Sequence, residues 1–318
     1  MTTYKEIFGK YVKNYSSDPS SDIEGQVWYN STTGVFKTNL AGAAAWAAGG
    51  NMGTARIELA GAGTQTAGLA FGGYTTAASN ATEEYNGSTW AGGGNMGTAR
   101  YQLAGAGTQT AGLGFGGYII TVSNATEEYD GSAWTGGGNL ATARRALAGC
   151  GTQTSGLAFG GVTTVNLANT EEYDGSAWTA GGNLGTARRF SAGAGSQTAG
   201  LGFGGFTTAR VDNTEEYDGS AWTAGGNLNT ARDQLAGCGL QTAGLAFGGT
   251  TGSLTGATEE YNGTSWTNST SMATARRLLG GAGIQTAGLG FGGEISGAVA
   301  NTEEYTDPVF TTKTITTS

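Results

Sequence analysis

The sequence contains no histidine, only two prolines and two cysteines, and no lysine between residues 38 and 312. Without histidine the chain cannot form a Ser-His-Asp triad, a Cys–His pair or an imidazole metal site. No apolar run approaches the roughly 20 residues that a membrane-spanning helix needs. The first fifteen residues, MTTYKEIFGKYVKNY, also lack the apolar core and cleavage site of a secretory signal. We therefore expect no catalytic residue, no cofactor, no metal and no membrane insertion.

The charge argues against a nucleic-acid-binding protein, and the cysteine usage argues against a disulfide-linked one. The formal net charge is −9, and arginine is the only cation between residues 38 and 312. Phosphate backbones require clustered basic surface, so we do not expect a nucleic acid partner. Cys150 and Cys238 occupy the same place in two copies of a repeat, where the other copies have alanine. They are predicted to be small, buried, free thiols.

What the sequence does have is a 44-residue unit that recurs six times without insertion or deletion. Each copy contains a TAR tripeptide that ends at Arg56, Arg100, Arg144, Arg188, Arg232 or Arg276. An EEY tripeptide ends at Tyr85, Tyr129, Tyr173, Tyr217, Tyr261 or Tyr305. A tryptophan stands at Trp46, Trp90, Trp134, Trp178, Trp222 or Trp266. A fixed period of this length indicates an array of one supersecondary unit.

Each unit divides into four short extended segments separated by turn signals, and none shows a sustained helical period. Four strands repeated six times predict an all-β, six-bladed β-propeller. The small residues of LAGAG suit the crowded innermost strands, whereas the Leu–Phe pair before the double glycine and the tryptophans suit the contacts between blades. The array opens at Trp46 and ends at Tyr305. The last blade should therefore take its outermost strand from the start of the array, which leaves no free sheet edge.

The order of these motifs resembles the kelch repeat. In the third copy the matching residues are Arg144, Gly160–Gly161, Glu171–Glu172–Tyr173–Asp174 and Trp178. The resemblance covers residues 46 to 305 and implies a kelch-like propeller. The chain departs from the family in its shorter link between Tyr–Asp and Trp and in its 61 glycines. An open-ended β-solenoid built from the same unit is the alternative.

The two ends do not follow the period, so residues 1–45 are predicted to be an N-terminal arm and residues 306–318 a C-terminal tail. Apolar residues of the arm share one face of a short helix, namely Tyr4, Ile7, Phe8, Tyr11, Val12 and Tyr15. QVWYNSTTGVFKT is predicted to form a hairpin that turns near Ser31–Gly34. The arm is expected to cover the side of the propeller, to dock on another structure or to mediate homo-oligomerisation.

The succession YKEIFGK, SSDP and EGQVWYNSTTGVFKT, followed by Gly- and Thr-rich repeats, resembles the N-terminal segments of structural proteins from marine bacteriophages. The resemblance covers about 40 residues. It implies a virion component, made in the host cytoplasm without a signal peptide, whose residues 1–45 attach to the particle and whose propeller is displayed outward.

Carboxylates and arginines are the remaining candidates for chemistry. Some six-bladed propellers are sialidases, and their Asp boxes resemble the DGSAW runs at Asp130, Asp174 and Asp218, although the spacing here is one residue shorter. Six equivalent EEY pairs nevertheless favour a structural role, because catalytic carboxyls need two different environments. The TAR arginines are expected near the central channel, bound to carbonyls and glutamates or, alternatively, to an anion on the axis.

The six copies differ mainly after TAR and after FGG, and in a four-stranded antiparallel blade these two loops emerge on the same face. The TQT and DGSAW turns on the opposite face hardly differ. Tyr, Trp and Arg dominate binding hot spots, which makes large residues in the divergent loops candidates for ligand contacts. The candidates are Tyr74, Tyr101, Tyr118, Ile119, Arg145, Arg189, Phe206, Arg210, Asp233 and Arg277.

The sequence thus predicts a non-enzymatic interaction module on a phage particle, which binds a host surface glycan or protein through its divergent loops. Two alternatives stay open. The chain could decorate a capsid or tail without binding a host ligand, or it could cleave glycans.

Overall fold

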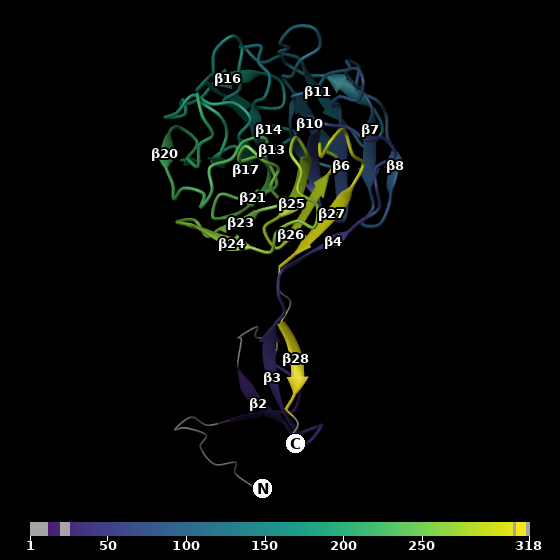
Figure 1. Cartoon of the computed structure of the whole chain (residues 1–318), viewed down its shortest axis with the longest axis vertical. Coiled ribbons are helices and arrows are strands. Elements are labelled where there is room, and N and C mark those ends of the chain that lie inside the picture. Colours follow the sequence, from purple (N-terminus) through teal and green to yellow (C-terminus); the bar gives the residue numbers. More distant parts are fainter. Residues whose placement is uncertain (1–11, 20–25, 308–309, 316–318) are drawn as a thin grey trace. The chain divides into compact units, whose positions relative to one another are not determined.

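The computed structural model describes residues 12–19, 26–307 and 310–315. Within these ranges the chain is all-β, without helices, and forms seven four-stranded sheets (Figure 1). The chain divides into two compact units, of which one comprises residues 45–305 and the other residues 1–44 together with 306–318. Six sheets belong to the repeats and one lies outside them, so the sheet count exceeds the expected six.

Among residues 45–305, five of the six sheets follow chain order from the innermost to the outermost strand, and the sixth ends in β4. The innermost strands are β5 (Ala60–Thr64), β9 (Ala104–Thr108), β13 (Ala148–Thr152), β17 (Ala192–Ser196), β21 (Ala236–Leu240) and β25 (Gly280–Ile284). The second strands are β6 (Ala67–Phe71), β10 (Ala111–Phe115), β14 (Ser155–Phe159), β18 (Ala199–Phe203), β22 (Ala243–Phe247) and β26 (Ala287–Phe291). The third are β7 (Thr82–Tyr85), β11 (Thr126–Tyr129), β15 (Thr170–Tyr173), β19 (Thr214–Tyr217), β23 (Thr258–Tyr261) and β27 (Thr302–Thr306). The outermost are β8 (Trp90–Gly92), β12 (Trp134–Gly136), β16 (Trp178–Ala180), β20 (Trp222–Ala224), β24 (Trp266–Ser269) and β4 (Ala45–Ala48).

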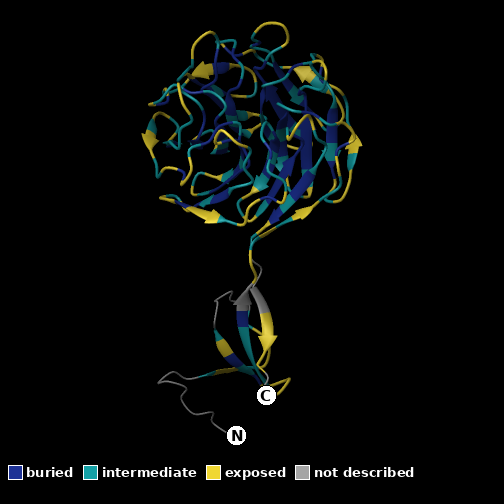
Figure 2. Ribbon diagram, viewed as in Figure 1, coloured by how far each residue is buried: buried dark blue, intermediate teal, exposed yellow. Residues whose placement is uncertain are grey.

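The innermost strands are adjacent around an axis, and their small residues allow this crowding. Ala148 and Cys150 are buried, and Gly149 alternates with them. A Cβ atom at Gly149 would come within 2.4 Å of the Phe115 ring of the preceding sheet. Glycine is therefore required where the phenylalanine of one sheet packs on the next. Figure 2 shows burial concentrated in the inner strands, with exposed residues on the outermost ones.

Strand β4 joins the two ends of the array, as the sequence predicts. It is the outermost strand of the sixth repeat's sheet, beside β27, and just beyond it the N–H of Gly49 donates to the carbonyl of Thr302 (2.9 Å). The sheets remain separate, and contacts between neighbouring sheets complete the circle, including those between β25 and β5. The arrangement is propeller-like, and every repeat meets two others.

Aromatic side chains fill the interface between neighbouring sheets. Trp178 packs on Phe115 of the preceding sheet and on Tyr173 of its own, with ring centroids 4.9 Å apart in both pairs. Its Nε1 donates to Thr126 Oγ1 of the preceding sheet (2.9 Å). Trp46 of β4 makes the same hydrogen bond to Thr258 of the fifth sheet (2.9 Å), and Trp90 of the first sheet makes it to Thr302 of the sixth (2.9 Å). The interface between the last sheet and the first therefore has the chemistry of the others.

A tyrosine–glutamate hydrogen bond repeats at every interface as well. Tyr173 Oη donates to Glu128 Oε1 of the preceding repeat (2.5 Å), and Tyr85 donates to Glu304 (2.5 Å) to complete the circle. Burial, followed by the bond to the carboxylate, raises the pKa of Tyr173 to about 12. The tyrosines therefore act as neutral donors that connect one sheet to the next.

The second unit contains a single sheet in the order β1 (Lys13–Tyr15), β2 (Val27–Asn30), β3 (Val35–Ala41) and β28 (Phe310–Thr314). The expected hairpin is present as β2 and β3. The expected tail, in contrast, supplies β28, which lies antiparallel to β3. Most of the residues of the expected helix, from Tyr4 to Tyr11, lie outside the described ranges, and Tyr15 belongs to a strand.

A small polar cluster organises this sheet. Asp18 accepts hydrogen bonds from the indole of Trp28 (3.3 Å), the amide of Asn30 (2.7 Å) and the ammonium of Lys37 (2.7 Å). These contacts lower the pKa of the Asp18 carboxyl, and the bond from Lys37 contributes most. Trp28 is fully buried. One carboxylate thus connects the segment after β1 to both strands of the hairpin.

Replacing Trp178 by alanine should destabilise the repeat unit strongly. The change removes a buried side chain, two ring contacts and a hydrogen bond, and we expect a loss of about 3–5 kcal/mol in the free energy of unfolding. Trp178→Phe, which keeps a ring in the interface, should lose less. Denaturant unfolding measures both variants, and an unchanged midpoint for Trp178→Ala would show that this interface does not hold the sheets together.

The interfacial tyrosines should resist ionisation in the native protein. The pKa values of Tyr85, Tyr129, Tyr173, Tyr217 and Tyr261 are each raised to about 12. Because the folded pKa exceeds the ordinary value near 10, their contribution to stability is complete below about pH 10 and is lost towards pH 12. At about pH 11 the phenolate absorbance of the native protein should fall well below that of the denatured chain; equal absorbance would contradict the buried Tyr–Glu contacts.

Candidate functional site

The divergent segments meet at one end of each sheet. The residue after TAR pairs with the residue after FGG in every repeat, as in the bridge between Arg145 and Val162. At the other end of β13 the TQT turn lies against the DGSAW turn. The two turns are so close that a Cβ atom at Gly175 would lie 3.4 Å from Thr154. We call the end that carries the divergent segments the variable face.

Three tyrosines of the variable face form one aromatic arc. The Tyr101 ring lies 5.1 Å from Tyr74 and 5.5 Å from Tyr118, edge-on to both. The guanidinium of Arg145 lies over the Tyr118 ring, 4.7 Å from its centroid. Ile119 follows Tyr118 and is 39% exposed. The structure therefore brings five of the sequence candidates together in the first three repeats.

The fourth and fifth repeats bring together four more candidates, and these are mostly charged. Arg189 lies over the Phe206 ring (4.8 Å) and donates to Asn166 Oδ1 (2.9 Å). Arg210 donates to the carboxylate of Asp233 (2.9 Å). Asp233 is only 3% exposed, and burial raises the pKa of its carboxyl. Asp233 thus positions Arg210 and presents little of its own surface.

Arg277 stands apart from these two groups, since it donates to Glu294 of its own repeat (2.7 Å). Two residues absent from the sequence candidates add apolar surface near the aromatic arc. Ile120 is 84% exposed and Val165 is 64% exposed. The sequence could have indicated both residues, because each is an apolar side chain in a loop already recognised as divergent.

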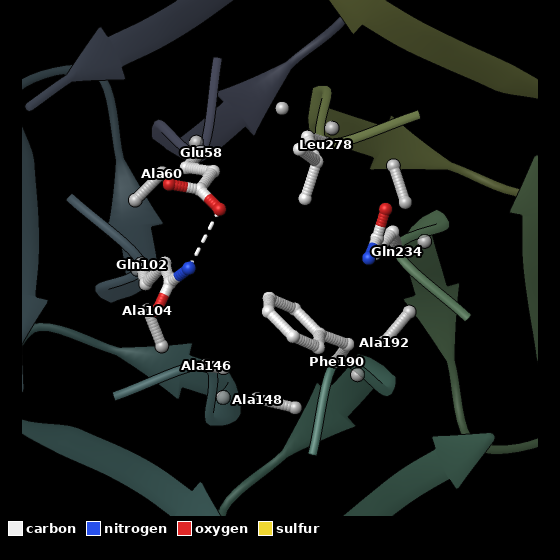
Figure 3. A pocket seen from close by; sticks show the side chains of 18 of the residues that line it. Glu58, Ala60, Gln102, Ala104, Ala146, Ala148, Phe190, Ala192, Gln234 and Leu278 are labelled. Atoms are coloured by element: carbon white, nitrogen blue, oxygen red, sulfur yellow. Dashed lines mark hydrogen bonds between the residues drawn. The ribbon is translucent and has the colours of Figure 1, made fainter. Parts of the chain in front are cut away.

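The residues at the mouth of the central channel are divergent in the sequence but are not among the sequence candidates. They stand two positions after each TAR and surround a cavity of about 150 Å³ (Figure 3). These channel-mouth residues are Glu58, Gln102, Ala146, Phe190, Gln234 and Leu278. Glu58 accepts a hydrogen bond from Gln102 Nε2 (2.6 Å), and burial raises the pKa of its carboxyl. Their diversity in otherwise similar copies was the available signal.

The TAR arginines belong to the framework of the sheets. Arg144 is fully buried, its Nη2 lies 3.1 Å from Glu171 Oε1, and its Nη1 donates to the carbonyls of Gly160 (3.2 Å) and Asn169 (2.7 Å). The other five arginines are equally buried, and each pairs with the first glutamate of an EEY motif. The alternative of an axial anion site at these arginines is therefore wrong, because their guanidinium groups are enclosed.

The acidic motifs have framework partners too. The two glutamates of each EEY face opposite sides of the strand, as β geometry requires. Glu171 binds Arg144, whereas Glu172 accepts from Tyr217 of the next repeat (2.5 Å). Asp174 accepts from the N–H groups of Ser176 and Ala177 (both 2.8 Å), which lower the pKa of its carboxyl. The DGSAW carboxylate therefore stabilises its own turn.

The described residues contain neither a candidate metal cluster nor a candidate membrane-spanning helix. Residues 12–19, 26–307 and 310–315 contain no cluster of three or more Cys, Asp or Glu side chains suited to a metal ion. The same residues include no helix with the length and apolarity needed to traverse a bilayer. Cys150 and Cys238 are buried free thiols, as predicted, and burial raises the pKa of each to about 12.

No protein-family model matches the sequence, and no curated protein matches it either. The resemblances to kelch repeats and to phage structural proteins therefore remain hypotheses, which depend on the residues quoted for them.

Breaking one framework ion pair should be costly. Arg144→Met leaves Glu171 buried without its cation, and we expect a loss of about 3–5 kcal/mol in the free energy of unfolding. The double variant Arg144→Met with Glu171→Gln removes the unpaired charge as well, so it should be more stable than the single variant. Denaturant unfolding distinguishes the two, and equal stability of both variants would contradict a buried, charge-paired Glu171.

Proposed function

We propose that the chain is a six-bladed, kelch-like propeller that acts as a non-enzymatic interaction module, displayed on the surface of a phage particle. In this proposal the variable face binds a host surface glycan or protein. The observation that carries the proposal is the concentration of sequence differences at one end of sheets whose frameworks are otherwise nearly identical.

The composition of the variable face supports binding. Its first three repeats present the aromatic arc with Ile119 and Ile120, and its later repeats present Arg189, Arg210 and Arg277. Tyrosine and arginine are enriched among residues that dominate binding energy. An apolar, aromatic side next to a charged side suits a partner that has both kinds of surface.

Attachment to the particle is assigned to residues 1–45. The support is the resemblance of this segment to phage structural proteins, together with its position in a unit separate from the repeats. The unit also includes β28, so both ends of the chain would contribute to the attachment. A capsid- or tail-decorating protein without a host ligand would use the same unit, and only the variable face distinguishes the two functions.

The glycan-cleaving alternative receives less support. The EEY carboxylates already have partners within the sheets. The first glutamate of each motif pairs with an arginine, and the second accepts a hydrogen bond from a tyrosine. A hydrolase needs two carboxyls in distinct environments that reach the substrate. The repeated carboxylates are equivalent to one another and bound within the sheets, which favours a structural role.

The double variant Tyr101→Ala with Arg189→Ala should abolish adhesion to host cells without unfolding the protein. Tyr101 is the centre of the aromatic arc, and Arg189 lies over Phe206 on the charged side. Truncating two such residues removes at least about 2 kcal/mol each if both are hot spots. Adhesion of purified protein to host cells measures the effect, and thermal unfolding verifies the fold.

A matched control lies on the opposite face. Leu240 and Ile284 are exposed at a position where the other copies have Thr or Ser. Leu240→Thr with Ile284→Thr should leave adhesion unchanged. Full adhesion by a folded Tyr101→Ala, Arg189→Ala protein, or its loss in the control, would overturn the assignment of the variable face.

A further inference from the structure

The channel mouth has a backbone conformation that disfavours side chains. Its six residues have φ between 52° and 57°, and all other residues of the described chain with positive φ are glycines. Each N–H donates to the carbonyl of its counterpart in the preceding repeat, and Glu58 completes the circle by donating to Leu278 (2.9 Å). Glycine could make these backbone bonds without the cost of about 1–2 kcal/mol per residue. Retained side chains therefore point to a role other than folding.

The mouth carries three polar and three apolar side chains. Glu58, Gln102 and Gln234 supply polar groups, whereas Ala146, Phe190 and Leu278 supply apolar surface. In Figure 3 the Phe190 ring projects into the opening, between the two polar sides. A pocket with one aromatic wall and a few oriented polar groups is the usual design of a small-molecule site.

Two buried polar atoms without a hydrogen-bond partner belong to residues that line this cavity. Across the described residues such atoms are mostly the repeated Arg Nε and Glu Oε1 atoms of the framework ion pairs. The exceptions are Arg145 Nε, Ser191 Oγ and Gln234 Oε1. Ser191 and Gln234 line the cavity, and Arg145 borders it through a hydrogen bond to Gln102 (3.3 Å). Burial without a partner costs each group about 1–3 kcal/mol.

The chemistry of these atoms defines the ligand. Gln234 Oε1 can only accept a hydrogen bond, and the Ser191 hydroxyl can donate and accept. A neutral ligand rich in hydroxyl groups satisfies both, since each hydroxyl donates and accepts. A sugar ring adds C–H groups on its faces, which can pack against Phe190.

We propose that the channel mouth binds one sugar ring, the terminal unit of a surface glycan. This proposal rests on the proposed host recognition. Phe190 packs on a face of the ring, while Glu58, Ser191 and Gln234 bind its hydroxyls. A cavity of about 150 Å³ has roughly five times the volume of a water molecule and is smaller than the ~300–1,000 Å³ typical of drug-sized ligands. One ring fits this size, and the aromatic arc is left to contact the units that follow.

The test is a titration of the full chain with a panel of neutral, acidic and amino monosaccharides, followed by nuclear magnetic resonance of the cavity residues. We expect at least one sugar to bind with a Kd of about 1 mM, typical of a single small group. Phe190→Gly removes the aromatic wall and relieves the positive φ, so the fold should be kept while binding weakens at least about tenfold. Leu240→Thr, on the opposite face and outside the cavity lining, should bind as the parent does.

Two results would overturn the proposal. In the first, no sugar of the panel shifts the resonances of the mouth residues, and water alone binds Ser191 and Gln234. In the second, Phe190→Gly binds the sugar as tightly as the parent does. Host adhesion of the parent, measured alongside, separates this proposal from the proposed function. Adhesion that resists glycan removal but not protease, with no sugar bound, keeps the function and rejects the sugar site. Sugar binding at the mouth without adhesion keeps the sugar site and rejects the proposed function.

Discussion

Six equivalent interfaces around one axis are the constraint on which the rest of this structure depends. Each interface repeats a tryptophan–threonine bond, a tyrosine–glutamate bond and packing of tryptophan on phenylalanine. Trp90 and Tyr85 make the same bonds between the first sheet and the sixth, to Thr302 and Glu304. A circle of identical interfaces closes only if every repeat turns the chain by the same angle, which explains why six copies tolerate no insertion or deletion.

This constraint separates residues that hold the sheets from residues that are free to differ. Arg144 and Glu171 illustrate the first class, because each is buried and bound to the other. Their neighbours Arg145 and Ala146 illustrate the second, because they stand one and two residues later and reach the variable face and the channel mouth. Residues of the framework and residues of the variable face are therefore adjacent in sequence.

At the channel mouth the backbone is the same in all six repeats, but the side chains differ. The six backbones share one conformation and one circle of hydrogen bonds, yet Glu58 and Phe190 present a carboxylate and an aromatic ring to the same cavity. A symmetric scaffold of this kind lets single substitutions change the chemistry of a site without changing its geometry. The same is true of the aromatic arc, where Tyr101 occupies a position that is arginine or aspartate in later repeats.

The sequence by itself determined the period, the strands of each repeat, the small residues of the inner strands and the outer strand supplied by Trp46, because these depend on local pattern and on phase. It also placed the divergent loops together, since strand direction alternates. Only the tertiary structure decided the partners of Arg144 and Tyr129, the exposure of Ile120, the channel mouth and the pairing of β28 with β3. Tyr129 binds Glu84 from 45 residues away, and Thr312 binds Asn39 across 273 residues. Such contacts depend on how distant strands pair and how sheets stack, which a linear pattern of residues does not encode.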